Sequence, residues 1–170
     1  ETHIKNISLM IDTPDMFSID ISLKKTSDSK KNLHNDIESL LLEAKNIIQK
    51  NYLEKKIIHM IVKKFIVDGK EYFNIPDNDL SYKLLIIELK FICFASEIWK
   101  NLRNLFNSNF IDIDNIYCSS YVRAGNCNLL FDNYKKKVIL DIGYSRSAIS
   151  IFDENRILYF NMLPVGGRHI

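Results

Sequence analysis

The types and spacing of four residues near the end of the sequence, Asp141, Gly143, Gly166 and Gly167, are those of a phosphate site. The apolar run 138–140 predicts a buried strand that ends at Asp141, and Gly143 predicts a tight turn directly after it. Successive backbone N–H groups in such a turn can form a nest that binds an anion. A carboxylate at the strand end can hold a water bound to Mg²⁺, which keeps several of its waters in proteins. The spacing therefore predicts phosphate binding, with Asp141 facing the metal through water.

A hairpin and a glycine pair must position these residues. Residues 148–152 predict a second strand, residues 153–155 a turn, and residues 157–164 a third strand. The glycine pair then predicts a junction between a strand and a helix, whose N-terminus can approach an anion. The expected cofactor-binding set is Asp141, Gly143, Tyr144, Ser145, Arg146, Ser147, Gly166 and Gly167.

The first third of the sequence predicts two strands and a long helix. Residues 4–11 read as a strand, and residues 19–24 alternate apolar and polar side chains as a half-buried strand does. Asn35 predicts a helix cap, and Glu38, three residues on, completes an arrangement close to a capping box. The helix is expected to bury one stripe, formed by Ile37, Leu40, Leu41, Ala44, Ile47 and Ile48.

The middle of the sequence predicts a hairpin followed by alternating strands and helices. Residues 57–67 are rich in β-forming side chains and end at Asp68 and Gly69, a dipeptide typical of hairpin turns. Further predicted elements are a strand over 82–94, a helix capped by Ser96, a strand over 111–118, a helix over 119–130 and a charged connector over 133–137.

Composition and charge exclude several classes of protein. The 170 residues are 46% hydrophobic, which is too apolar for a disordered chain, and 23 basic against 21 acidic residues argue against a nucleic-acid partner. Short basic clusters such as 135–137 are expected to be solvated surface. The longest apolar run, 84–94, is shorter than the ~20 residues that a spanning helix needs. The chain begins with glutamate, and both ends are expected to be cuts in a longer protein.

Two residues outside the hairpin, His59 and Trp99, are of types that often have a functional role, but we expect both to be structural. His59 has no second histidine or carboxylate at useful spacing, so we expect a hydrogen-bonded structural histidine. Trp99 falls on the apolar face of its predicted helix and is expected in the core. No arrangement of Ser, His and Asp or of Cys and His can be argued from their order alone.

Taken together, these motifs resemble the FtsA family of bacterial cell-division proteins, within the actin-like ATPase superfamily. Residues 138–170 resemble the family's strand, Asp-Ile-Gly-Gly-Gly-Thr-Thr, strand and Pro-x-Gly-Gly-x-x-Ile-Thr. Residues 57–69, followed by residues 74–76, resemble its His-x-x-Pro-x-x-Tyr-x-x-Asp-Gly and Pro-x-Gly-Met. Residues 119–130 resemble the helix that returns through subdomain 1A, and residues 35–37 the start of the helix of subdomain 1C.

The sequence departs from that family pattern in the phosphate loop. Tyr144 stands where the family has a second glycine, and Ser145 where it has a third glycine or a serine. Arg146 and Ser147 stand where it has two threonines. Arg146 thus adds a cation where a hydroxyl is expected, and it either pairs with a phosphate or blocks the site. The family's first phosphate loop and adenosine-binding glycines lie outside these residues. Val62 likewise replaces a family proline.

The resemblance implies an α/β fold with an α+β insert: a piece of the actin/ribonuclease-H-like ATPase fold with a strand-helix-strand-strand subdomain, also called SHS2. Four segments are expected: 1–13 as the end of subdomain 1A, 14–108 as the inserted 1C-like subdomain, 109–133 as the returning 1A segment, and 134–170 as the start of subdomain 2A with the phosphate-loop hairpin.

The resemblance also implies a function. FtsA-like proteins bind ATP with Mg, have at most weak ATPase activity, polymerise, tether the tubulin-like FtsZ, and recruit later division proteins through subdomain 1C. They are cytoplasmic and peripheral on the inner face of the cell membrane at the division site. Their membrane-binding helix lies at the far C-terminus, outside these residues.

Two alternatives remain open at the level of sequence. A relative of PilM, the type IV pilus assembly protein, has a similar architecture and binds a short peptide from a membrane partner. A sugar kinase or exopolyphosphatase of the same superfamily shares the Asp-x-Gly hairpin and turns over a small substrate. Asp68 and Gly69, in the 1C-like insert, favour FtsA over the enzymes.

Overall fold

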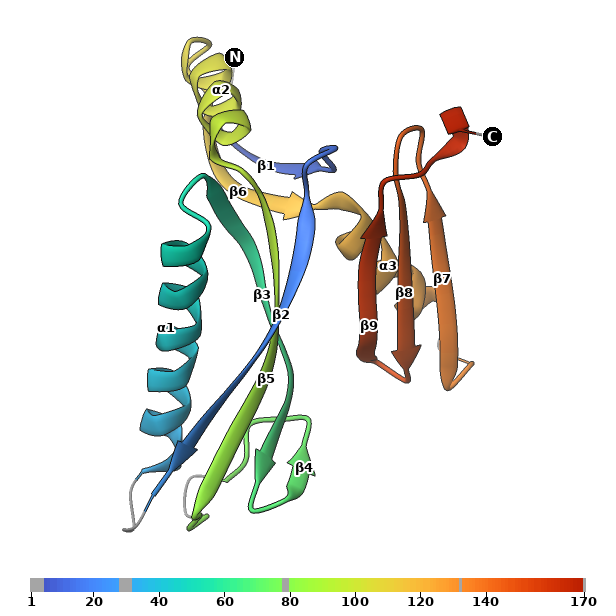
Figure 1. Ribbon diagram of the computed structural model, residues 1–170. Coiled ribbons are helices and arrows are strands. Elements are labelled where there is room, and N and C mark those ends of the chain that lie inside the picture. The colour runs from blue at the N-terminus through green and yellow to red at the C-terminus, as the bar shows by residue number, and fades with distance from the viewer. Residues whose placement is uncertain (1–4, 28–31, 78–79, 132, 170) are drawn as a thin grey trace. The chain divides into compact units, whose positions relative to one another are not determined.

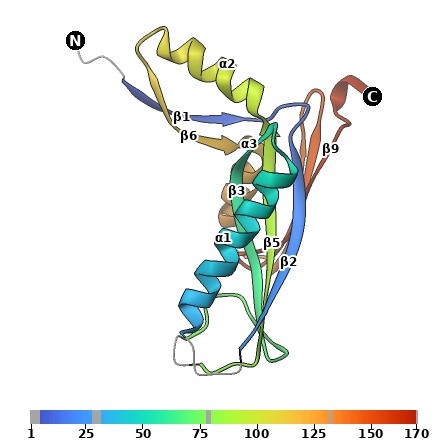
Figure 2. The same cartoon turned by 60° about the vertical axis from the view of Figure 1, so that its left-hand side comes forward.

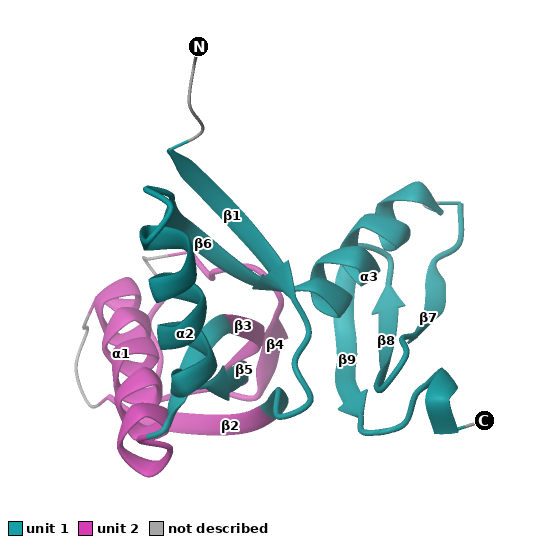
Figure 3. Cartoon of the chain, turned by 90° about the horizontal axis from the view of Figure 1, so that it is seen from above, with its two compact units in different colours: residues 1–18, 54–59, 92–170 teal, residues 19–53, 60–91 magenta. Residues whose placement is uncertain are grey.

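A computed structural model describes residues 5–27, 32–77, 80–131 and 133–169. The fold is mixed α/β, as predicted, with three sheets and three α-helices among these residues. The chain forms two compact units: unit 1 comprises residues 1–18, 54–59 and 92–170, and unit 2 comprises residues 19–53 and 60–91 (Figure 3). The four expected segments stay a prediction.

A four-stranded sheet and a long helix, which covers one of its faces, make up most of unit 2 (Figure 1). The strands stand in the order β2, β5, β3, β4. The predicted apolar stripe is confirmed for Ile37, Leu40, Ala44 and Ile48, which are buried. The elements are β2 (Phe17–Thr26), α1 (Leu33–Asn51), β3 (Lys55–Val67), β4 (Lys70–Tyr72) and β5 (Leu84–Ala95).

Helix α1 begins earlier than the sequence predicts. Its N-cap is Asn32, whose side-chain oxygen accepts a hydrogen bond from the backbone N–H of Asn35 at 3.2 Å. Leu33, the first helical residue, is fully buried and extends the apolar stripe one turn upstream of Ile37. The prediction that Asn35 caps the helix was wrong because packing of this extra turn moved the start to the preceding asparagine.

The predicted hairpin at Asp68 and Gly69 is confirmed. Strands β3 and β4 pair antiparallel around it, and both turn residues have positive φ, 49° and 85°. Two successive positive φ angles are those of a type I′ turn, which matches the twist of the flanking strands. The Asp68 carboxylate also accepts hydrogen bonds from the N–H groups of Lys83 and Leu84, at 3.0 and 2.8 Å, and so fixes the start of β5.

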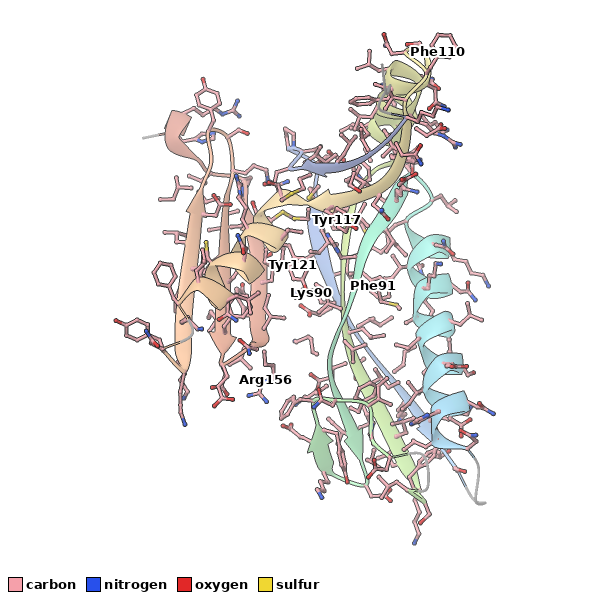
Figure 4. All side chains as sticks on the ribbon, turned by 180° about the vertical axis from the view of Figure 1, so that it is seen from behind. Lys90, Phe91, Phe110, Tyr117, Tyr121 and Arg156 are labelled. Carbon is pink, nitrogen blue, oxygen red and sulfur yellow. The ribbon has the colours of Figure 1, made fainter. Side chains whose placement is uncertain are left out.

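Strand β5 is buried along most of its length although it carries two charges. Lys90 is 5% exposed, and its Nζ lies 2.7 Å from Oδ2 of Asp20 on β2. Successive residues of a strand point to opposite faces, so Phe91 lies on the α1 side and Lys90 on the other (Figure 4). A buried ammonium needs such a partner because desolvation disfavours its charge.

Unit 1 contains two further sheets. Strands β1 (Asn6–Ile11) and β6 (Asp112–Cys118) pair parallel (Figure 2), and helix α2 (Ser96–Asn107) contacts β6. Helix α3 (Ser119–Leu130) follows β6 directly and packs on the antiparallel sheet β7–β8–β9. The bounds of that sheet are Lys136–Ile142, Ser147–Asp153 and Arg156–Leu163.

Helix α2 differs from its sequence prediction at its cap and in its burial. Its N-cap is Ala95, with no side-chain cap, rather than Ser96. No residue of this helix is buried, so Trp99 is a half-buried ring whose face receives Nζ of Lys56 at 4.6 Å. Phe110, at the tip of the turn beyond α2, is 92% exposed (Figure 4).

Strand β7 is not the continuously buried strand that its apolar run predicts. Val138, Leu140 and Ile142 are more than half exposed, while Lys137 is buried. Helix α3 packs against this sheet, and a sheet covered on one face buries alternate residues only. Lys137 donates from Nζ to the carbonyl oxygens of Asn128 and Phe131, at 2.8 and 3.0 Å.

This lysine corrects two predictions about the basic cluster. Residues 136 and 137 belong to β7 and not to a charged connector. Lys137 is no solvated surface residue either, since it satisfies carbonyl groups at the C-terminal end of α3 that the helix itself leaves unpaired. Within the described ranges, no helix is both long and apolar enough to cross a membrane.

Candidate functional site

The candidate site is a pocket within unit 1 where three segments meet. Asp12 follows β1, Ser120 and Arg123 lie in the first turns of α3, and the loop 143–147 joins β7 to β8. The cavity has a volume of about 150 Å³. Pockets for drug-sized ligands start at about 300 Å³, so this cavity suits a single small group such as a phosphate. Its lining is Asp12, Ser120, Arg123, Gly143, Tyr144, Ser145, Arg146, Ser147 and Met162.

The loop 143–147 is held in shape by the glycine pair after β9. Gly167 and Arg168 donate their N–H groups to the carbonyl oxygens of Gly143 and Tyr144, both at 2.9 Å. A Cβ on Gly166 would lie 2.5 Å from the oxygen of Gly143 and 2.6 Å from the nitrogen of Arg146. Only glycine permits this close approach of the two segments. The predicted helix after the pair is a short 3₁₀ turn, Gly167–His169.

The backbone N–H groups at the tip of this loop differ from their neighbours in their hydrogen bonding. Gly143 uses its own N–H to close the turn on the oxygen of Arg146, at 2.8 Å. Among the described residues, none accepts a hydrogen bond from the N–H groups of Tyr144, Ser145 or Arg146. The hydroxyl of Ser147 is already used, because it donates to the carbonyl oxygen of Val165 at 2.7 Å. Three successive N–H groups without an acceptor have the composition of an anion nest.

Asp12 links the end of β1 to the start of α3. Its carboxylate accepts hydrogen bonds from the N–H and the hydroxyl of Ser120, at 3.1 and 2.6 Å from Oδ2. The N-cap residue of α3, Cys118, makes no side-chain cap. Asp12 therefore satisfies an N-terminal N–H of the helix from a distant part of the chain, and a carboxylate there interacts favourably with the helix dipole.

Arg123 lies between two carboxylates. Its Nη2 is 2.7 Å from Oδ2 of Asp141 and 3.4 Å from Oδ2 of Asp12. The contact with Asp141 is an ion pair without hydrogen-bond geometry, since that buried oxygen receives no hydrogen bond from any described residue. Asp141 itself does not line the pocket, whereas its partner Arg123 does.

The expected magnesium does not fit this arrangement. A guanidinium is the cation beside Asp141, the carboxylate that the sequence assigns to the metal. Mg²⁺ at one carboxylate would have to displace Arg123 and leave that arginine without its closest counter-charge. The loop itself does fit a phosphate group.

Arg146 is the second cation of the pocket. Its Nη1 donates to the carbonyl oxygen of Thr13 at 2.5 Å, and its Nε is buried with no hydrogen-bond partner among the described residues. Burial lowers the pKa of the guanidinium, while the charges of Asp12 and Asp15 raise it. An arginine side chain nevertheless stays protonated in a protein, so the pocket keeps a positive charge with one unused donor.

The sequence found the loop and missed its partners. Gly143 to Ser147 line the pocket and the glycine pair packs against them. Asp12, Ser120 and Arg123 were not predicted as site residues. One signal could have found Asp12 and Ser120: each follows one of two strands, and the carboxyl ends of neighbouring parallel strands meet at one edge where ligands bind.

His59 lies outside this pocket and is the structural histidine that the sequence predicts. Its Nε2 accepts a hydrogen bond from the N–H of Cys118 at 2.9 Å, and its ring centroid lies 4.9 Å from that of Tyr121. Burial lowers its pKa from the usual value. The ring is therefore neutral and serves as an acceptor at the junction between β6 and α3.

Comparison with known proteins gives one curated relative and a fold. No model of a known protein family matches the chain. The chain is similar to the cell division protein FtsA of Bacillus subtilis (strain 168), with 28% identity over 131 residues, which cover 76% of this chain. The matched part is 29% of that protein, so the chain spans less than a third of the length of the curated relative.

A solved structure shares the fold of the chain. It belongs to a PilM–PilN type IV pilus biogenesis complex, with a TM-score of 0.56 and 12% sequence identity. The similarity covers 90% of this chain and 41% of the chain in that complex. The α/β fold of the chain is therefore similar to the actin-like fold of PilM, as the sequence predicts.

Proposed function

We propose that this chain is part of an actin-like cell-division scaffold of the FtsA type, which tethers FtsZ to the membrane. The single observation that carries the proposal is the sequence similarity to FtsA over 131 residues. The actin-like fold supports it, because a scaffold of this type needs that fold.

In this scaffold the two units have different tasks. The pocket around the loop 143–147 forms one wall of a nucleotide cleft and binds the phosphates of ATP. The sheet β2–β5–β3–β4 with helix α1 is a 1C-like insert and presents a surface to later division proteins. Copies of the protein polymerise, and ATP turnover is weak.

The proposed place of action is the division septum, at the inner face of the cell membrane. The protein is cytoplasmic and peripheral there, and its membrane contact is a C-terminal helix beyond these residues. Its partners are proteins of the divisome and not nucleic acid, in keeping with the formal net charge of +2.

A pilus-assembly function of the PilM type is the second candidate, because the solved structure with the same fold is a PilM–PilN complex. At 12% identity that likeness concerns the fold, which both candidates share. The similarity in sequence is to the division protein, and for this reason we rank the FtsA-type function first.

The test is co-pelleting of the full-length protein with purified FtsZ and lipid vesicles, with and without ATP. Retention of FtsZ on the vesicles, above that of vesicles with FtsZ alone, is the expected result. A parallel arm offers a short PilN-type peptide to the protein and measures its binding. Peptide binding without FtsZ retention would replace the division function by the pilus function. Failure in both arms would reject both candidates.

A further inference from the structure

We propose that the pocket binds a phosphate group without a divalent cation, because two arginines divide between them the work that Mg²⁺ does in a phosphate site. Arg123 neutralises the carboxylates, and Arg146 together with the N–H groups at positions 144–146 holds the anion. The anion site follows from the geometry alone, whereas its assignment to the phosphates of ATP rests on the proposed function.

A metal ion at a phosphate site has two separable tasks. It cancels the negative charge of the carboxylates that would otherwise repel the phosphate, and it binds phosphate oxygens directly. A site can dispense with the ion when other cations perform both tasks. Guanidinium groups are suited to them because they pair with carboxylate and phosphate alike and never lose their charge.

Arg123 performs the first task. Its Nη2 lies 2.7 Å from Oδ2 of Asp141 and 3.4 Å from Oδ2 of Asp12, so its positive charge is close to both carboxylates. Asp12 is further neutralised by two hydrogen bonds from Ser120 at the N-terminus of α3. Without Arg123, two carboxylates beside the loop would repel any phosphate bound there.

Arg146 and the loop backbone perform the second task. The guanidinium is anchored through Nη1 on the oxygen of Thr13, which leaves the buried Nε with no acceptor among the described residues. The N–H groups of Tyr144, Ser145 and Arg146 likewise have no acceptor within the described ranges. Donors without an acceptor are costly to bury, and a phosphate in the pocket would offer its oxygens to the loop N–H groups and to the Arg146 guanidinium, which lines the pocket. The geometry thus favours phosphate pairing over blocking, the two alternatives that the sequence leaves open for Arg146.

The first experiment measures binding of ATP to the full-length protein by equilibrium dialysis, in excess Mg²⁺ and in excess EDTA. We expect dissociation constants that agree within about threefold between the two conditions. A loss of more than about tenfold in EDTA would overturn the inference, and so would the absence of binding of both ATP and pyrophosphate in both conditions. Pyrophosphate is tested in the same way; its binding without ATP binding would keep the anion site and remove the nucleotide assignment.

Variants separate the two arginines. Arg146→Thr removes the donor to the anion and should weaken ATP binding about tenfold in both conditions. Arg123→Gln uncovers the carboxylates, so binding should fall about tenfold in EDTA and recover when Mg²⁺ is added. The control is Arg156→Gln, which changes an arginine at the start of β9. Arg156 pairs with Asp153 and does not line the pocket. This variant should leave both dissociation constants unchanged.

Recovery by Mg²⁺ distinguishes charge neutralisation from a merely structural role of Arg123. Should Arg123→Gln fail to fold, Asp141→Asn gives the same information with the opposite sign. This variant should bind ATP at least as well as the unchanged protein in both EDTA and Mg²⁺, whereas replacing an essential metal ligand would weaken binding in Mg²⁺. Loss of binding would overturn the inference. Metal-free binding without FtsZ retention on vesicles would reject the proposed function alone.

Discussion

Replacing Asp36 by Asn should loosen helix α1 by a measurable amount. This carboxylate is 7% exposed, in the first turn of α1. It accepts a hydrogen bond from the hydroxyl of Tyr82 at 2.5 Å and pairs with Nζ of Lys25 at 2.5 Å. Burial, and then this hydrogen bond, raise the pKa of Tyr82. Asparagine keeps the size of the side chain and removes its charge.

The magnitude follows from three terms. Changing the acceptor of the Tyr82 hydrogen bond from a charged to a neutral group costs about 1 kcal/mol. The side chain of Lys25 is 32% exposed, so its pair with Asp36 is taken at the value for solvent-screened pairs, up to about 1 kcal/mol. Loss of a negative charge in the first helical turn costs about 0.3–1 kcal/mol. The sum is about 1.3–3 kcal/mol, or about tenfold to 150-fold in an opening equilibrium.

Hydrogen exchange of the α1 amides is the appropriate assay. A chain with two compact units need not unfold in one step, and exchange reports the local opening of the helix itself. The matched control is Glu38→Gln, an exposed carboxylate two residues further along the same helix. Amides of α1 should exchange about tenfold to 150-fold faster in Asp36→Asn than in this control.

Equal exchange in the two variants would refute the reasoning, because it would mean that the buried carboxylate contributes no more than an exposed one. A second check is the variant Tyr82→Phe, alone and combined with Asp36→Asn. The two substitutions share one hydrogen bond, so their effects should sum to more than the double variant shows.

Three further predictions concern unit 1. Gly166→Ala should lower the free energy of unfolding by about 1–3 kcal/mol, because the added Cβ displaces the loop. Gly125→Ala adds a Cβ that meets nothing within 4 Å and should stabilise α3 by about 0.5–1 kcal/mol. Chemical denaturation measures both changes. Lys137→Met should lower the free energy of unfolding by about 1–3 kcal/mol, because it leaves two carbonyl groups unpaired. The control Lys136→Met, at an exposed position of β7, should change it by less than about 0.5 kcal/mol. Hydrogen exchange of the last α3 amides measures both effects. Burial lowers the pKa of His59, so its contribution to stability is full above the unfolded value of about 6.5 and is lost as the pH falls below it. Urea midpoints should therefore drop from about pH 7.5 to about pH 5.5, and His59→Gln should reduce that drop.

Local signals in the sequence predicted most elements, and their failures share one cause. The hairpin at Asp68 and Gly69 depends on two residues alone, so the sequence could reveal it. The start of α1 depends on burial of Leu33, and the exposure of Val138 depends on which face of β7 a helix covers. Neither is encoded next to the residue concerned, because both follow from packing between segments.

The candidate site shows the same division between local and distant information. The loop at Gly143 is a contiguous motif, and the sequence therefore located it. The sequence around Arg123 gives no sign of its role, because both of its partners are distant in the chain. Asp12 lies 111 residues before it, and Asp141 lies on β7, beyond the connector that follows α3. The sequence predicts that Lys137 is solvated, because a run of three lysines usually lies on the surface.

The bonds that hold the loop 143–147 to the glycine pair have a kinetic consequence. Because the N–H groups of Gly167 and Arg168 already fix the oxygens of Gly143 and Tyr144, the loop has its shape before any ligand arrives. A phosphate entering it orders little of the chain, so association needs no slow rearrangement and is limited by encounter. Substitutions at the donors of this loop should then change how long the ligand stays, and hardly change how fast it arrives.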